Sequence, residues 1–142
     1  MIAFCDTSAL MKLFVTEAGS DAVRAHCKTA TFTAVSLLAW VEMCSALALK
    51  QRTKQIDAAV SESALASLKQ EWGRYQVLGV DVAVTLAAGE LAGQFGLRAY
   101  DSVQLASAMR LHQLAGLGMA FCCFDKTLNR AAATLGIPLL QT

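Results

Sequence analysis

The amino-acid sequence predicts an α/β fold of three layers, in which a parallel β-sheet lies between two layers of helices. Short apolar runs alternate along the chain with longer stretches whose apolar residues recur at helical spacing. Each short run is apolar throughout, which is typical of a strand that is buried on both faces. Strands that alternate with helices form parallel sheets. The length of 142 residues predicts one domain spanning residues 1–142.

The first half of the chain is expected to contain two strands and four helices. Ser20 and Ser36 are favourable N-caps, and β-branched and aromatic residues predict the second strand. The expected elements are a strand at 2–5, a helix at 8–14, a helix from Ser20 through Cys27, a strand at 31–35, a helix from the cap Ser36 to about Lys50, and a helix at 56–72.

The second half is expected to continue the alternation of strands and helices. Asp81 is a favourable N-cap, and Gly96 separates two helical stretches. The expected elements are a strand at 75–80, a helix from Asp81 to about Phe95, a helix from about Tyr100 to Ala115, a strand at 119–124, a helix at 126–135 and an edge strand at 137–140.

Composition excludes several classes of protein. With 56% hydrophobic and 16% charged residues, the chain is not disordered. Its longest charge-free stretches, 29–41 and 111–124, are shorter than the ~20 residues of a membrane span. No basic segment precedes an apolar stretch at the start, so no signal peptide is expected. The five cysteines show no CxxC spacing, and they are expected to be reduced core residues of a cytoplasmic protein, without a metal or redox role.

The charge balance bears on the possible partners. A net charge of +1 argues against a protein held on nucleic acid mainly by bulk electrostatics, although it leaves room for a local cationic groove. The surplus of apolar residues indicates contacts with a partner, either in a dimer or with another chain.

Four acidic residues lie where a charge is costly. Asp6 follows the first strand ("AFCDTSAL"), and Asp125 follows the fourth ("FCCFDKTL"). Glu42 lies in an apolar helix ("SLLAWVEMCSAL"), and Asp101 opens another ("RAYDSVQLASAM"). An unpaired buried carboxylate costs several kcal/mol or gives up its charge. Taken singly, each of the four could be a helix cap or half of a buried pair.

The predicted topology brings the four acids to one edge of the sheet. The carboxyl ends of parallel strands share an edge, which places Asp6 and Asp125 on the same side. Glu42 lies six residues after Ser36, roughly 9 Å along its helix, with its side chain tilted back toward the helix start. The helix that begins near Asp101 runs antiparallel to the fourth strand, so it starts at the same edge. All four acids converge on the crevice where open α/β sheets bind ligands.

Such a cluster predicts a metal site. Four carboxylates in one crevice repel each other unless a cation is present, and oxygen ligands suit Mg²⁺ or Mn²⁺. His26 and His112 lie on helices away from this edge, so zinc is not expected. A hard dication in an acidic pocket binds phosphate, orients a water and neutralises the leaving oxygen. The chemistry that fits is phosphodiester hydrolysis.

Four motifs carry a resemblance to a known family. "DTSAL-K-F", "S-L-A-VE--SAL", "LRAYDSVQLASA" and "FDKTLNRAA" stand in the order and spacing of the PIN-domain ribonucleases, and the chain is most similar to their VapC-type toxins of prokaryotic toxin–antitoxin pairs. The resemblance extends from residue 1 to about residue 140. It implies a PIN-like sheet of about five strands in the order 3-2-1-4-5 and a Mg²⁺- or Mn²⁺-dependent endoribonuclease that leaves a 5′-phosphate and a 3′-hydroxyl. A cognate antitoxin and a homodimer are also implied.

The resemblance also implies roles for particular residues. Asp6, Glu42 and Asp101 would hold the principal metal, and Asp125 would complete the pocket or hold a second metal. These four are the expected catalytic residues. Thr7 or Ser8 would lie beside the metal or the scissile phosphate.

Two cations and one departure complete the expected site. Lys12 and Arg98 are expected near this edge, where they would contact the RNA backbone, with solvated surface charges as the alternative interpretation. Relatives often carry a hydroxyl residue two places before the last acid, and here that residue is Cys123. A thiol is a poorer hydrogen-bond partner for phosphate.

Other functions fit the sequence less well. "FDKTL" loosely matches the D-x-D-G-T-L signature of haloacid-dehalogenase-type phosphotransferases, but it lacks the second Asp and the Gly and comes last in the chain. A receiver-like phosphoacceptor domain would need an adjacent acidic pair near the first strand, where only Asp6 is present. A non-catalytic PIN module that binds RNA or a partner without cutting stays open as the alternative to the nuclease.

Overall fold

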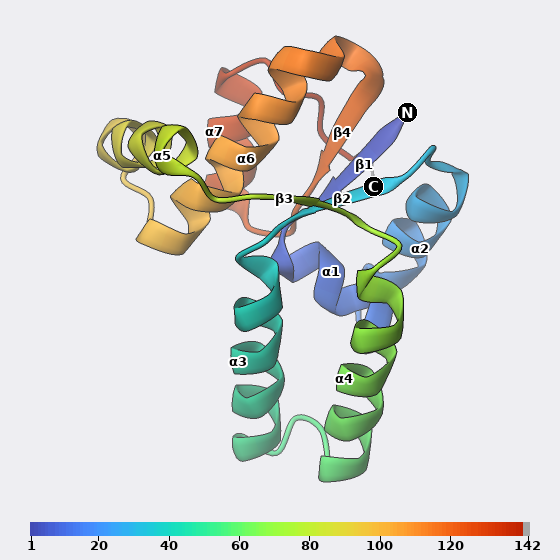
Figure 1. Cartoon of the computed structure of the whole chain (residues 1–142). Helices are drawn as coiled ribbons and strands as arrows, with labels where there is room; N and C mark the ends of the chain where they lie inside the picture. The colour runs from blue at the N-terminus through green and yellow to red at the C-terminus, as the bar shows by residue number, and fades with distance from the viewer. Residues whose placement is uncertain (141–142) are drawn as a thin grey trace.

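Residues 1–140 are described by a computed structural model, in which a parallel sheet lies between two groups of helices (Figure 1). The described strands are β1 (Ile2–Cys5), β2 (Thr33–Ser36), β3 (Gln76–Leu78) and β4 (Met119–Cys122). They lie in the order β3-β2-β1-β4, and every neighbouring pair is parallel. The three-layer α/β/α fold with a parallel sheet is therefore confirmed.

The helices of the described chain begin close to where the sequence predicts them. They are α1 (Thr7–Phe14), α2 (Ser20–Thr29), α3 (Ala39–Arg52), α4 (Ala58–Trp72), α5 (Val82–Phe95), α6 (Ala99–Ala115), the 3₁₀ turn η1 (Gly116–Gly118) and α7 (Lys126–Thr134). Aspartate caps four of them, because Asp6, Asp57, Asp81 and Asp125 each accept a hydrogen bond from the N–H three residues later. No helix within residues 1–140 is long and apolar enough to cross a membrane.

The expected fifth strand at residues 137–140 is reduced to a single parallel bridge between Leu139 and Phe121. The Phe121 N–H donates to the Pro138 carbonyl at 2.7 Å, and the Leu140 N–H donates to the Phe121 carbonyl at 3.0 Å. Extending this ladder toward Met119 would need an N–H from Pro138, which proline lacks. The described sheet therefore has four strands, and the expected edge strand is only a bridge beside β4.

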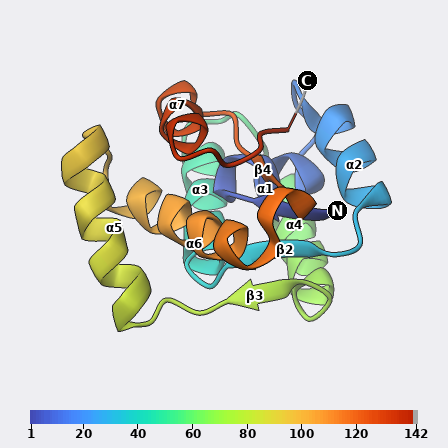
Figure 2. The same ribbon diagram turned by 90° about the horizontal axis from the view of Figure 1, so that it is seen from above.

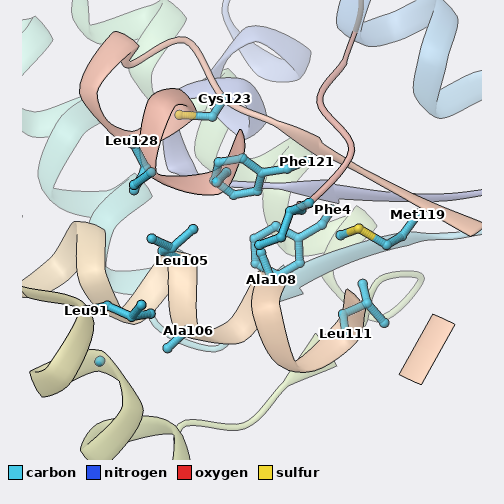
Figure 3. Packing of buried hydrophobic residues seen from close by; sticks show 14 of the residues in the cluster. Phe4, Leu91, Leu105, Ala106, Ala108, Leu111, Met119, Phe121, Cys123 and Leu128 are labelled. Carbon is cyan, nitrogen blue, oxygen red and sulfur yellow. The ribbon is translucent and has the colours of Figure 1, made fainter. Parts of the chain in front are cut away.

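Successive strand residues point to opposite faces of the sheet, so two cores form. Phe4, Met119 and Phe121 pack against α5, α6 and α7, and the Phe4 and Phe121 rings stack with centroids 5.8 Å apart (Figure 3). Helix α6 lies over the strands on this face (Figure 2). The opposite face packs against α1, α2, α3 and α4 through Ala3, Cys5, Val35 and Cys122. The continuously apolar strands of the sequence are explained by this burial on both sides.

The start of α3 differs from the prediction in a way that matters for the site. Ser36 is the last residue of β2, and its Oγ accepts a hydrogen bond from the Leu38 N–H at 3.2 Å. Helix α3 begins only at Ala39, after a short turn. Glu42 therefore lies in the first turn of α3, nearer to the sheet edge than a helix starting after Ser36 would place it.

The start of α2 shows that the predicted cap at Ser20 is wrong. Gly19 is the N-cap, with φ of 90°, and Ser20 is the first helical residue. The Ser20 hydroxyl instead accepts from the Glu17 N–H at 3.0 Å, which closes the turn after α1. A Cβ on Gly19 would lie 2.6 Å from the Phe124 ring, so both the backbone angle and the close packing require glycine.

Replacing Gly19 by alanine should lower the free energy of unfolding by about 1–3 kcal/mol, because a side chain is strained at this φ and would push against Phe124. Gly93 provides the matched control, since it lies in α5 with no neighbouring atom within 4 Å of an added Cβ. Gly93→Ala should be neutral or stabilising by up to about 1 kcal/mol. Urea unfolding of both variants gives the comparison, and an unchanged midpoint for Gly19→Ala would contradict this account of the turn.

Candidate active site

Asp6 is both a helix cap and a buried acid. It follows β1 at the carboxyl edge of the sheet, and only 5% of the residue is exposed. Its Oδ1 accepts hydrogen bonds from the Ser8 hydroxyl at 2.7 Å and from the Ala9 N–H at 2.9 Å. Ser8 is therefore in direct contact with Asp6.

Burial makes the charge on Asp6 costly. Desolvation raises the pKa of Asp6 from 3.8 to about 6, although hydrogen bonds from Cys123, Ser8 and Ala9 lower it in part. The charge of Glu42 raises the pKa further. Within residues 1–140, no lysine or arginine forms a salt bridge with Asp6. The carboxylate is thus held by polar groups without a compensating positive charge.

Glu42 joins α1, α3 and α6 through hydrogen bonds. The Thr7 hydroxyl donates to Glu42 Oε1 at 3.0 Å, and Gln104 Nε2 donates to the same oxygen at 2.8 Å. Burial raises the pKa of Glu42, the two hydrogen bonds lower it, and the charge of Asp101 raises it. The charge of Glu42 therefore acts on Asp6, and the charge of Asp101 acts on Glu42.

Gln104 is a site residue that the sequence reasoning missed. It is 1% exposed, and its Nε2 also lies 3.2 Å from the Thr7 hydroxyl, to which it donates. Its Oε1 is buried and has no hydrogen-bond partner within the described chain. The available signal was its position three residues after Asp101, on the same face of one helix, in a run of small and apolar residues. Gln104 orients the carboxylate of Glu42.

Asp101 lies in the first turn of α6 and forms an ion pair with Arg98. Arg98 Nε donates to Asp101 Oδ2 at 3.1 Å, and 82% of the Arg98 side chain is exposed. The pair sits beside Glu42, whose pKa the Arg98 charge lowers. Arg98 therefore belongs to the site, where it partly neutralises the acids.

Asp125 is placed less directly among the acids than expected. Its Oδ1 accepts from the Leu128 N–H at 2.8 Å, so the carboxylate caps α7. Cys123 links it to the surroundings of Asp6 through Ser8, because the thiol sulfur accepts from the Asp125 N–H at 3.3 Å and lies 3.9 Å from the Ser8 hydroxyl that donates to Asp6. Burial and the charge of Asp6 raise the pKa of Cys123, which keeps the thiol neutral. The thiol at the position of the usual hydroxyl thus lies beside Ser8, the hydrogen-bond partner of the first acid of the site.

Lys12 is engaged in an ion-pair cluster at the border of the site. Glu17 accepts hydrogen bonds from Lys12 at 3.1 Å and from Lys50 at 3.2 Å, and the Lys12 Nζ lies 4.5 Å from the centre of the Phe124 ring. Partial burial raises the pKa of Glu17, but the hydrogen bonds and charges of the two lysines outweigh it and lower that pKa. A groove beside this cluster also contains Thr7. Lys12 is therefore close to the site but is not a free cation.

A second groove opens on the other side of Thr7. It is lined by Thr7, Glu42, Arg98 and Tyr100, together with the apolar face of α3. Because both grooves share Thr7 and Ala46, an extended ligand lying in them would pass beside Glu42 and Ser8.

The acids suit a hard cation in their chemistry. The donors are carboxylate oxygens, and burial and mutual repulsion disfavour the charge on Asp6 and Glu42, which a dication would relieve. As the side chains are arranged, no three His, Cys, Asp or Glu residues of the described chain are grouped closely enough to hold a metal ion. The Ser8 hydroxyl donates a hydrogen bond to Asp6, and the Arg98 guanidinium donates one to Asp101. The metal-ligand assignment of the four acids stays a prediction.

Comparison with known proteins identifies the family. The sequence model of the PIN domain matches residues 3–133. The chain belongs to the PIN-domain family. Ribonuclease VapC46 of Mycobacterium tuberculosis is 34% identical to this PIN domain over 137 residues, which is 96% of this chain and 95% of that protein. The resemblance to VapC-type ribonucleases is thereby confirmed.

Solved structures agree on the fold of the PIN domain. The crystal structure of FitAcB from Neisseria gonorrhoeae has a TM-score of 0.70 at 16% identity, and the match covers 99% of this chain and 97% of that chain. A toxin–antitoxin complex from Klebsiella pneumoniae has a TM-score of 0.64 at 17% identity, covering 98% of this chain and 96% of that chain. At such low identity these likenesses concern the fold alone.

Replacing Asp6 by asparagine should stabilise the metal-free protein at neutral and alkaline pH. Asparagine can still accept the hydrogen bonds from Ser8 and Ala9, but it carries no charge to bury. The raised pKa means that the folded state keeps a proton which the unfolded chain loses above pH 3.8. The wild type therefore loses stability as the pH rises from 3.8 to about 6, by roughly 3 kcal/mol in total.

Urea unfolding of both proteins in a chelating buffer, from about pH 4 to about pH 8, measures this effect. The Asp6→Asn variant should gain up to roughly 3 kcal/mol over the wild type at the upper end and little at the lower end. Equal stabilities across the range would show that the Asp6 charge is not costly.

Proposed function

We propose that this PIN domain is a metal-dependent endoribonuclease of the VapC type, the toxin of a toxin–antitoxin pair. The observation that carries the proposal is the arrangement of Asp6, Glu42 and Asp101 as neighbouring acids at the carboxyl edge of the sheet, with raised pKa values for Asp6 and Glu42. The named ribonuclease relative, matched over nearly the whole chain, supports the same reaction.

The acids would hold Mg²⁺ or Mn²⁺, with Asp6, Glu42 and Asp101 as the principal ligands and Asp125 completing the pocket. The cation would supply positive charge for the scissile phosphate and for the leaving oxygen. Ser8 fixes the carboxylate of Asp6, and Thr7 and Gln104 fix that of Glu42, so the donor atoms are oriented in advance. Asp101 would exchange its partner Arg98 for the cation, which frees Arg98 for an RNA phosphate.

RNA binding is proposed along the two grooves that meet at Thr7. Arg98 borders one groove, and Lys12 and Lys50 border the other. Both lysines form ion pairs with Glu17, so they would give this groove a positive border whose net charge is reduced by Glu17. This arrangement agrees with a net charge of +1, since the cations are local and few.

A cognate antitoxin is the proposed protein partner. Leu37, Val41 and Leu49 of the α3 region are each more than half exposed, and Val41 and Leu49 line the groove that holds Glu42 and Arg98. A chain that covered this apolar strip would also block the acids. The toxin–antitoxin complex among the structural relatives supports this partner. The homodimer and the cytoplasmic location expected from the sequence belong to the same proposal.

Asp6→Asn should reduce RNA cleavage at least about 100-fold, because the variant lacks a charge that holds the cation. Asp57→Asn is the matched control, since Asp57 caps α4 through the same hydrogen bond to an N–H three residues later but lies on an exposed turn. The purified chain would be assayed on structured RNAs with Mg²⁺ or Mn²⁺ and with EDTA.

The control should cleave like the wild type, and EDTA should stop both. Full activity of Asp6→Asn, or cleavage in EDTA, would refute the assigned site. Binding of RNA without cleavage by the wild type would favour the non-catalytic PIN module instead.

Divalent metal should raise the melting temperature of the wild type, since only the folded state assembles the ligands. At a metal concentration 100 times the dissociation constant the stabilisation is about 2.7 kcal/mol. The Asp6→Asn and Glu42→Gln variants should lose most of this increase, whereas Asp57→Asn should keep it. A thermal melt with and without Mn²⁺ measures it, and the absence of any increase at millimolar metal would count against binding by these acids.

A further inference from the structure

Three cysteines lie on the face of the sheet that is opposite α6, and two of their thiols are in contact. Cys5 ends β1, Cys122 ends β4 beside it, and Cys27 lies near the end of α2. The Cys5 and Cys27 sulfur atoms are 3.7 Å apart, although the residues are 22 positions apart in the sequence. The contact between Cys5 and Cys27 is therefore a close pair of thiols from two separate elements.

The two thiols differ in the way that a reactive cysteine differs from its resolving partner. Cys27 is partly exposed, whereas Cys5 is completely buried. A hydrogen bond from Cys5 lowers the pKa of Cys27 to about 7, against the effect of burial. Only the thiolate is nucleophilic, and reactive cysteines are accessible thiols of lowered pKa that lie next to a second cysteine.

We infer that Cys27 and Cys5 are an oxidation site, at which a hydroperoxide converts the two thiols into an intramolecular disulfide. The site departs from the expectation that all five cysteines are inert core residues. The sequence contains no CxxC motif to indicate it, because its two sulfur atoms come from a strand and from a helix that the fold brings together.

The reaction proceeds in two balanced steps. The Cys27 thiolate attacks the terminal oxygen of the hydroperoxide, so an S–O bond forms, the O–O bond breaks, and the alcohol leaves after taking up the thiol proton. The Cys5 sulfur then attacks the Cys27 sulfur, an S–S bond forms, and the S–O bond breaks with loss of water that carries the Cys5 proton. The thiols lose two electrons in total, and the hydroperoxide gains them.

The disulfide would fasten the end of β1 to α2. Cys5 immediately precedes Asp6, so the bond would form one residue from the first acid of the candidate active site. An effect of oxidation on RNA cleavage rests on the proposed function, whereas formation of the disulfide does not. Chemical readouts therefore test the inference even if the chain cleaves no RNA.

The experiment treats the reduced full-length chain with hydrogen peroxide, alkylates the remaining thiols and maps the linked peptides by mass spectrometry. The wild type should lose two hydrogen atoms in mass, and the linked peptides should contain Cys5 and Cys27. Cys44→Ser is the matched control, because Cys44 is a partly buried cysteine of α3 with no thiol partner in the described chain, and this variant should form the same disulfide.

Two variants separate the roles of the thiols. Cys27→Ser should form no disulfide with Cys5. Cys5→Ala should stop at the sulfenic acid of Cys27, which forms more slowly because the hydrogen bond from Cys5 is lost, and a dimedone reagent traps this product. In the unoxidised wild type at neutral pH, an alkylating reagent should modify Cys27 at least about tenfold faster than Cys44.

Several results would overturn the inference. These are a disulfide between Cys5 and Cys122, oxidation of Cys27 to the sulfinic acid without a disulfide, and five free thiols after treatment of the wild type. The wild-type peptide map and the alkylation rates decide the matter even if Cys5→Ala, which alters a fully buried residue, fails to fold.

Discussion

The parallel pairing of β1 with both β2 and β4 is the constraint on which the rest of the structure depends. It places β1 in the interior of the sheet, so the residue after it emerges at the carboxyl edge between two other strand ends. Helices α1 and α3 follow strands that end there, and α6 runs back so that its first turn reaches the same edge. The elements that carry the acids of the candidate site start at one edge because the strands share one direction.

Burying acids at this edge is tolerated because each carboxylate has polar partners. Asp6 accepts from Ser8 and Ala9, and Glu42 accepts from Thr7 and Gln104. These hydrogen bonds lower the pKa values only in part, so the two acids remain destabilised as anions. A bound dication would relieve that cost, which couples metal binding to the stability of the fold.

Three positive charges near the edge are engaged with acids in the described chain. Arg98 is paired with Asp101, and Lys12 and Lys50 share Glu17. Such pairs hold the cations in place without a large net field, because each charge is balanced locally. A polyanion entering the grooves would compete with these carboxylates for the cations, and so the pairs would also disfavour weak ligands.

The sequence by itself determined the fold class and most element positions, and it picked out the four acids as a prediction. Strands that are apolar throughout predict burial on both faces of the sheet, and an aspartate before a helix predicts an N-cap, as at Asp6 and Asp125. These are local signals. The missing fifth strand, the turn before α3 and the role of Gly19 depend on what lies opposite each backbone group, which composition does not specify.

Only the tertiary structure decided the partners. In the sequence, Gln104 looks like an ordinary helical residue. In the folded chain it donates hydrogen bonds to Thr7 and Glu42, which lie on two other helices. From the sequence, Asp125 looks equivalent to Asp6, but its carboxylate caps its own helix, and Cys123 links its backbone to Ser8, the partner of Asp6. In the sequence, Cys27 looks like a core thiol, but in the folded chain the Cys5 thiol at the end of β1 lies against it. Hydrogen bonds and pKa values depend on distances between segments remote in sequence, and packing alone sets those distances.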